Sequence, residues 1–207
     1  MYNDMTGIIL CGGKSSRMGQ NKAFLKLGGQ TAIERTAALM GSLFAKNILI
    51  TNTPAEYTFL NLEMFQDIYK DRGPLAGIHA GLAHSTTRKN FVISCDMPMV
   101  TQEAIRFIVD FPSTQAIVVP LADGFVQQLC GIYNKECAET IKRILQDYDS
   151  NEIRHKGQQE RKCKVMALLD EMNAQRLDLE KIYPGHQSST FLNMNHPEDY
   201  QAILKLL

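Results

Sequence analysis

The sequence predicts an α/β protein in which helices cover both faces of a mostly parallel sheet. Short apolar runs alternate along the chain with segments of helical periodicity. Two of these runs, residues 7–11 and 91–95, are almost entirely apolar, as expected of strands that are buried on both faces. For 207 residues without an evident linker we expect one domain, residues 1–207.

The strands are predicted from the apolar runs. They are residues 7–11, 47–51, 91–95, 116–121 and 126–133, with a short strand at 191–194. Because strand and helix alternate, most of these strands should run parallel, with their carboxyl ends at one edge of the sheet. Ligands of such sheets bind beyond that edge.

The helices are predicted from apolar periodicity and capping signals. The first begins with a capping box, Thr31 followed by Glu34, and repeats apolar residues on one face as far as Phe44. Thr101 is the predicted N-cap of another helix. The remaining predicted helices are 74–82, 101–111, 134–145, 165–169 and one that starts at Pro197.

Composition excludes several classes of protein. Twenty-two Lys and Arg residues balance twenty-two Asp and Glu residues, so no overall field attracts nucleic acid or a membrane surface. Five scattered cysteines without a C-x-x-C pair indicate buried or free thiols in a reducing compartment. The amino terminus does not read as a signal peptide, and no apolar run reaches the length of a membrane span. We therefore expect a cytoplasmic protein.

A glycine-rich, basic loop follows the first predicted strand. Residues 10–22 read LCGGKSSRMGQNK, and no acidic residue occurs between Met5 and Ile33. Gly12 and Gly13 would let main-chain N–H groups approach a phosphate closely. Surface lysines on a solvated loop are the alternative reading. A Walker A loop is excluded because its first glycine would fall on Ile8, and the G-x-G-x-x-G dinucleotide fingerprint is absent.

This loop resembles the L-x-G-G-x-x-x-R-M-G-x-D-K signature of nucleotidyltransferases, and most closely that of the MobA-like molybdenum cofactor guanylyltransferases. The resemblance implies a three-layer, Rossmann-like nucleotidyltransferase fold. It also implies that main chain of the loop holds the nucleotide and that two basic side chains meet its phosphates. The residues so assigned are Leu10, Cys11, Gly12 and Gly13 for the main chain, and Arg17 and Lys22 for the phosphates. One position departs from the signature: Asn21 stands where the family usually has Asp, which keeps an acceptor but loses the charge.

A second segment, residues 66–77, resembles the family's D-…-G-P-L-A-G motif. By this resemblance Asp67, together with Asn52 after an earlier strand, is a candidate for contacts to the base or ribose. Gly77 falls within a predicted helix, where glycine costs about 1 kcal/mol relative to alanine. Either close approach by the nucleotide or close packing of the helix on the sheet would explain it.

A third segment ends a buried strand on an acid. Residues 91–98 read FVISCDMP and resemble the family's C-D-x-P motif, whose Asp binds Mg²⁺. Asp96 is therefore the candidate metal ligand, since Mg²⁺ takes few carboxylates and keeps phosphate and water oxygens. An N-cap or a turn residue is the alternative reading for an acid at this place.

Near the carboxyl terminus, residues 191–199 resemble the family's N-x-N-x-P-E-D/E motif. On the predicted short strand, Asn193 and Asn195 would point the same way and could support the metal or the acceptor's phosphate. Alternatively, Asn195 and His196 cap the last helix. A basic segment between residues 154 and 164 suits an anionic acceptor, with a solvated helix face as the alternative.

The resemblance implies transfer of GMP from GTP to the terminal phosphate of the molybdopterin cofactor, with Arg17, Lys22 and Asp96 as catalytic residues and Mg²⁺ as cofactor. It allows transient contact with other proteins of molybdenum cofactor biosynthesis. Three alternatives stay open: a cytidylyl- or sugar-phosphate nucleotidyltransferase, a non-catalytic nucleotide-binding relative, and a dinucleotide oxidoreductase. Asp96 speaks against the second, and the missing fingerprint against the third.

Overall fold

The computed structural model describes residues 1–12, 21–151 and 165–207. The strands are β1 (Tyr2–Leu10), β2 (Lys26–Leu27), β3 (Gln30–Thr31), β4 (Phe44–Ile50), β5 (Glu63–Phe65), β6 (Lys89–Ser94), β7 (Ile117–Ala122), β8 (Phe125–Val126), β9 (Cys130–Asn134) and β10 (Gln175–Asp178). The helices are η1 (Lys22–Phe24), α1 (Ala32–Leu43), η2 (Pro54–Leu60), α2 (Pro74–His84), α3 (Gln102–Asp110), α4 (Cys137–Asn151), α6 (Val165–Glu171), α7 (Leu179–Ile182) and α8 (Pro197–Leu204). None of these helices has the length and apolar character needed to cross a membrane.

The main sheet has the strand order β10-β7-β9-β6-β1-β4-β5, with β8 paired to β7. β1 lies between β6 and β4 and is parallel to both, and β5 and β10 also pair in parallel with their neighbours. β9 runs antiparallel to β6 and to β7. The prediction of a mostly parallel sheet is therefore confirmed, with β8 and β9 as its antiparallel members.

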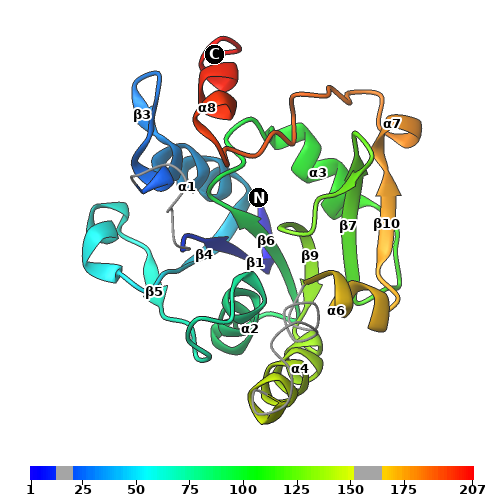
Figure 1. The fold of residues 1–207 in the computed structure, drawn as a ribbon. Coiled ribbons are helices and arrows are strands. Elements are labelled where there is room, and N and C mark those ends of the chain that lie inside the picture. Colours follow the sequence, from blue (N-terminus) through cyan, green and yellow to red (C-terminus); the bar gives the residue numbers. More distant parts are fainter. Residues whose placement is uncertain (13–20, 152–164) are drawn as a thin grey trace.

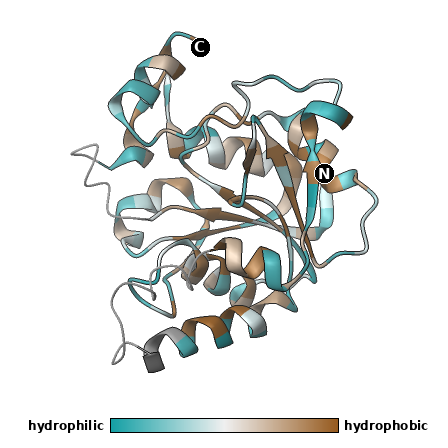
Figure 2. Cartoon of the chain, turned by 45° about the vertical axis from the view of Figure 1, so that its right-hand side comes forward, coloured by the Kyte–Doolittle hydropathy of each residue, from teal (hydrophilic) through white to brown (hydrophobic). Residues whose placement is uncertain are grey.

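Helices cover both faces of this sheet (Figure 1). Successive residues of β1 alternate between two cores: Ile9 joins the apolar cluster that contains residues of α1 and α3, whereas Ile8 and Leu10 join the cluster with α2, α4 and α6. This alternation follows from the two-residue period of a strand, and it explains why the run is apolar throughout. Figure 2 shows the central strands as a hydrophobic band between the helical layers.

The local helix signals are borne out. Thr31 caps α1, with the reciprocal bonds of a capping box between Thr31 and Glu34. Thr101 caps α3 by accepting a hydrogen bond from the N–H of Ala104. Helix α4, in contrast, begins at Cys137 rather than at residue 134, because Asn134 belongs to β9, and it extends to Asn151.

Two predicted strands differ from the structure. The run 126–133 is divided into β8 and β9, and the main-chain N–H of Gln127 bonds to the carbonyl of Pro120 in between. Pro120 has no N–H to return to the partner strand, so the ladder is interrupted there. The strand at 191–194 is wrong: Thr190 and Leu192 form turn hydrogen bonds instead, and only Met194 reaches the β6 end, through a bond to the carbonyl of Asp96.

Helix α8 is held against the β2–β3 hairpin by a separate small cluster. Leu25, Leu27 and Ala32 pack there with Met194 and Ile203. This contact brings the carboxyl-terminal segment beside η1, which immediately precedes the hairpin. It therefore places residues 194–196 next to the end of the glycine-rich loop.

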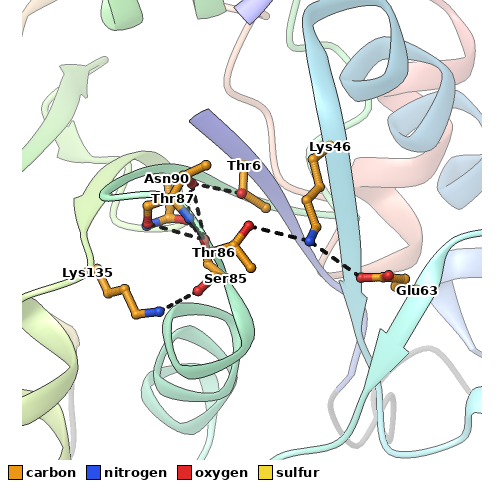
Figure 3. A network of polar contacts seen from close by, with 8 residues as sticks. All are labelled: Thr6, Lys46, Glu63, Ser85, Thr86, Thr87, Asn90 and Lys135. Atoms are coloured by element: carbon orange, nitrogen blue, oxygen red, sulfur yellow. Dashed lines mark hydrogen bonds and ion pairs between the residues drawn. The ribbon is translucent and has the colours of Figure 1, made fainter. Parts of the chain in front are cut away.

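A buried polar network holds the other end of α2, at the edge where β1 and β6 begin (Figure 3). Ser85, which ends α2, donates to Asn90 of β6, and Thr87 is hydrogen-bonded to Thr6 of β1 at 2.8 Å. Lys135 donates to the carbonyl of Ser85. Because these groups satisfy one another out of water, the network fixes α2 relative to β1 and β6.

Close packing within the sheet gives a testable pair of substitutions. A Cβ atom at Gly131 of β9 would lie 2.4 Å from the carbonyl oxygen of Val118, so Gly131→Ala should lower the free energy of unfolding by about 2 kcal/mol. Gly41 in α1 has nothing within 4 Å of such an atom, and Gly41→Ala should raise stability by about 0.5–1 kcal/mol. Urea denaturation measures both; equal effects of the two changes would contradict the packing described for β9.

Candidate active site

The carboxyl ends of β1, β4, β5 and β6 meet at one edge of the sheet. Hydrogen bonds between neighbouring strands continue one residue past the strands: Cys95 N–H donates to Leu10 O at 3.1 Å, Cys11 N–H to Ile50 O at 2.9 Å and Thr51 N–H to Phe65 O at 2.9 Å. The residues that follow each strand are thereby fixed side by side. This is the edge at which parallel α/β sheets bind their ligands.

Two predicted site residues, Asn52 after β4 and Asp67 after β5, form a reciprocal pair. The Asn52 side-chain amide donates to Asp67 Oδ2 at 2.8 Å, and the Asp67 main-chain N–H donates to Asn52 Oδ1 at 3.1 Å. Burial raises the pKa of the Asp67 carboxyl, the bond from Asn52 opposes this, and the charge of Asp71 adds to the rise. The structure thus holds Asp67 in one orientation in a partly desolvated place.

Gly77 lies where α2 approaches β1 and Asp67. A Cβ atom at this position would be 3.3 Å from Leu10 Cδ2 and 3.7 Å from Asp67 Oδ1. The packing explanation for this glycine is therefore supported, and a contact to the nucleotide stays a prediction. Helix α2 starts at Pro74 after Gly73, whose φ of +66° is a conformation that glycine adopts without strain.

Lys22 and Asp96 come together across the edge. Lys22 Nζ lies 3.8 Å from Asp96 Oδ2, and each of the two side chains is 20% exposed. The same ammonium group donates to Asn195 Oδ1 at 2.7 Å. Three predicted site residues from separate parts of the sequence thus form one cluster.

Asn21 acts structurally in place of the family's Asp. Its side-chain oxygen accepts from the N–H of Ala23 and so caps η1, which begins with Lys22. Its amide donates to Tyr57 Oη at 2.9 Å and to Glu56 at 3.4 Å. Asn21 therefore connects the end of the glycine-rich loop to η2.

The remaining predicted site residues either lie outside these two groups or fall outside the described part of the chain. Cys11 turns its side chain into the core beside Cys95, and the hydrogen bond from that thiol lowers the pKa of Cys11. A Cβ atom at Gly12, after the end of β1, would meet no atom of the described residues within 4 Å. Asn193 donates to the carbonyl of Phe191, and within the described part of the chain it makes no hydrogen bond to Lys22, Asp96 or Asn195. Gly13, Arg17 and the basic segment 154–164 lie outside the described residues.

The surroundings of Asp96 fit a hard cation. Its Oδ1 atom is buried without a hydrogen-bond partner among the residues described, and a buried carboxylate oxygen left bare is costly. Thr101 rather than Asp96 caps α3, so the N-cap reading of Asp96 is wrong, while its place in a turn is confirmed. Mg²⁺ needs only one or two protein carboxylates when phosphates supply further oxygens.

A second group could also hold a divalent metal. Asp123, Glu180 and His186 have ligand atoms that lie within 4.8 Å of one another, in the part of the chain that the structure covers. Asp123 follows β7 and Glu180 follows β10, so the group lies at the same edge as Asp96. Sequence reasoning missed it, because Asp123 follows β7, Glu180 lies in α7 and His186 follows that helix, and the three share no motif spacing.

Tyr57 is a further residue that the sequence did not indicate. It is 1% exposed, stacks on Phe24 of η1 at 5.1 Å between ring centroids, and accepts the bond from Asn21. Burial raises the pKa of its hydroxyl. The only sequence signal for Tyr57 was an aromatic residue in a largely polar stretch. This signal does not reveal its partners, Phe24 and Asn21, which lie 33 and 36 residues away in the sequence.

Known proteins are similar to this chain in sequence and in fold. A family model described as the MobA-like NTP transferase domain matches residues 7–162. The chain is 32% identical over 204 residues to the probable molybdenum cofactor guanylyltransferase of Carboxydothermus hydrogenoformans, an alignment that covers 98% of this chain and 96% of that protein. The chain belongs to the MobA-like NTP transferase family.

Further MobA-like proteins agree with this assignment. The molybdenum cofactor guanylyltransferase of Desulfosudis oleivorans is 37% identical over 143 residues, covering 68% of this chain and 71% of that one. Molybdopterin-guanine dinucleotide biosynthesis protein A of Archaeoglobus fulgidus superposes with a TM-score of 0.78 over 97% of both chains at 22% identity. This last likeness confirms the predicted three-layer nucleotidyltransferase fold.

The partly buried Asp67 gives a prediction about pH. Because the folded-state pKa is raised, the stability that Asp67 contributes is fully present below the unfolded value of 3.8 and is lost as the pH rises through the folded value. Asp67→Asn should therefore become more stable relative to the wild type as the pH is raised from acid to neutral. Urea denaturation over this range measures the difference, and Asp4→Asn, at an exposed position of β1, corrects for the loss of one negative charge. A constant difference would contradict the assigned effect of burial.

Proposed function

We propose that this protein transfers GMP from GTP to the terminal phosphate of the molybdopterin cofactor and releases pyrophosphate. The observation that carries the proposal is the cluster of Lys22, Asp96 and Asn195 beside the Asn52–Asp67 pair, at the carboxyl edge of a parallel sheet. The names of the two curated relatives, both guanylyltransferases of the molybdenum cofactor, support the same activity.

In this proposal the nucleotide lies across the end of β1. Main chain of Leu10, Cys11, Gly12 and Gly13 approaches the phosphates, where a Cβ atom at Gly12 would meet nothing within 4 Å. Lys22 binds the triphosphate, and Arg17 stabilises charge on the leaving pyrophosphate. Such charge-assisted contacts are stronger and shorter than those between neutral groups.

Asp96 would hold Mg²⁺ through its buried, unpartnered Oδ1 atom. When bound, Mg²⁺ supplies positive charge to the phosphate oxygens around the reacting phosphorus. The acceptor phosphate is already a nucleophile, so no side chain is required to act as a strong base. Catalysis by this chain's residues then consists of alignment and of neutralising charge.

The Asn52–Asp67 pair is assigned to the guanine base. Guanine presents N1–H and N2–H₂ donors on one edge, and a single carboxylate can accept both. Asn52 holds Asp67 in place, and Gly77 leaves room beside Asp67 Oδ1. Cytosine presents one amino donor flanked by acceptors, so it would leave the carboxylate half-paired.

A competition between nucleotides tests the proposed function. GTP should be used for transfer onto the molybdopterin cofactor about tenfold to a few hundredfold better than CTP, because a half-paired buried acceptor costs roughly 1–3 kcal/mol. Asp67→Asn should lose most of this preference while the maximal rate with GTP changes less than the KM. Equal or better use of CTP by the wild type would overturn the guanylyl assignment and favour the cytidylyl alternative.

The metal assignment is tested by Asp96→Asn. The amide keeps the size of the side chain and can still accept a bond from Lys22, so circular dichroism of the variant should be unchanged. Turnover should fall by at least roughly a hundredfold, because a neutral amide is a poor ligand for Mg²⁺. Transfer at the wild-type rate in single-turnover experiments would remove Asp96 from the metal site.

A further inference from the structure

The ammonium group of Lys22 lies beside one oxygen atom of the Asp96 carboxylate, Oδ2. It lies 3.8 Å from Asp96 Oδ2 and donates to Asn195 Oδ1 at 2.7 Å. With each side chain 20% exposed, the ion pair is partly shielded from water. A pair so shielded interacts more strongly than one on the open surface.

Main-chain hydrogen bonds fix all three members of this cluster. Lys22 starts η1, which Asn21 caps. The N–H of Met194 donates to the carbonyl of Asp96 at 2.8 Å, and the Asp199 carboxylate accepts from the N–H of Asn195 at 2.9 Å. Lys22, Asp96 and Asn195 are therefore held by three separate elements, and the ion pair depends little on the freedom of any one loop.

A divalent ion at Asp96 and an ammonium group at the same carboxylate repel each other. In a site that is partly shielded from water this repulsion is stronger than it would be on the open surface. Oδ1 of Asp96 has no partner among the described residues, so the carboxylate can bind an ion there. The interaction of the metal ion with the Asp96 carboxylate reaches its full strength only if Lys22 moves away from Oδ2.

We propose that Lys22 is the resident cation of Asp96, that Asn195 holds it there, and that a divalent metal ion binds Asp96 in competition with it. This inference rests on the proposed function in taking Asp96 as the metal carboxylate. The released ammonium group is then free for the triphosphate that accompanies the ion. Metal and nucleotide consequently favour each other's binding, because each removes Lys22 from its resting partners.

Titration with Mn²⁺ in the absence of nucleotide tests the competition, with free Mn²⁺ measured by electron paramagnetic resonance. Lys22→Met keeps an unbranched side chain that is one atom shorter and removes its charge, and this variant should bind Mn²⁺ about tenfold more tightly than the wild type. Asn195→Ala should tighten binding by about two- to fivefold, because Lys22 loses one of its two partners. Lys26→Met is the matched control: it removes an exposed charge nearby that acts on Glu34, and Mn²⁺ affinity should be unchanged.

Thermal unfolding gives a second readout that needs no activity. Mn²⁺ should raise the Tm of Lys22→Met more than that of the wild type. In the double variant Lys22→Met/Asp96→Asn, which lacks the carboxylate, this additional rise in Tm should disappear. If Lys22→Met binds Mn²⁺ no more tightly than the wild type while Asp96→Asn loses the ion, the proposed competition is wrong. Asp96 then remains the assigned metal ligand. Because the Asp123, Glu180 and His186 group could also take up Mn²⁺, all variants are compared in a Glu180→Gln background. Full Mn²⁺ binding by Asp96→Asn in that background would overturn both the competition and the metal assignment.

Discussion

The register of the parallel strands at the carboxyl edge is the constraint on which the rest of the site depends. Main-chain bonds from Cys95 to Leu10, from Cys11 to Ile50 and from Thr51 to Phe65 extend the ladder past the strands themselves. The residues that follow these strands are therefore positioned by main-chain hydrogen bonds, whatever contacts their side chains make. A slip of one residue in β6 would turn Asp96 away from the edge and into a core.

The site is assembled from two halves on either side of β1. One half consists of Asn52 and Asp67, which follow β4 and β5, and of Gly77 in α2. The other half consists of Lys22 in η1, Asp96 after β6, and Asn195 in the carboxyl-terminal segment that the small cluster around Met194 holds in place. In the proposed function the first half binds the base and the second binds the triphosphate and its metal ion.

Features with local causes could be predicted from the sequence, and features with distant causes could not. The Thr31 cap and the apolar β1 and β6 strands follow from neighbouring residues, and a family motif marked Asp96. Strands β5 and β10 are three and four residues long and exist because neighbouring strands pair with them. Asn195 reaches Lys22 across 173 residues, through a turn where a strand was predicted. The base, phosphate and metal roles of these residues remain predictions.

Two glycines of α2, Gly77 and Gly81, restrict how the sequence of this fold can vary. A Cβ atom at Gly81 would lie 2.5 Å from Ile8 Cγ2, just as one at Gly77 would meet Leu10. At these two positions only the side chains of Ile8 and Leu10 lie between the helix and β1, and they fill the space that a larger helix residue would need. Positions 77 and 10, like 81 and 8, form units that must vary together: a larger residue on the helix requires a smaller one on the strand. A larger residue at position 77 would also contact Asp67, because Asp67 Oδ1 lies 3.7 Å from where its Cβ atom would be.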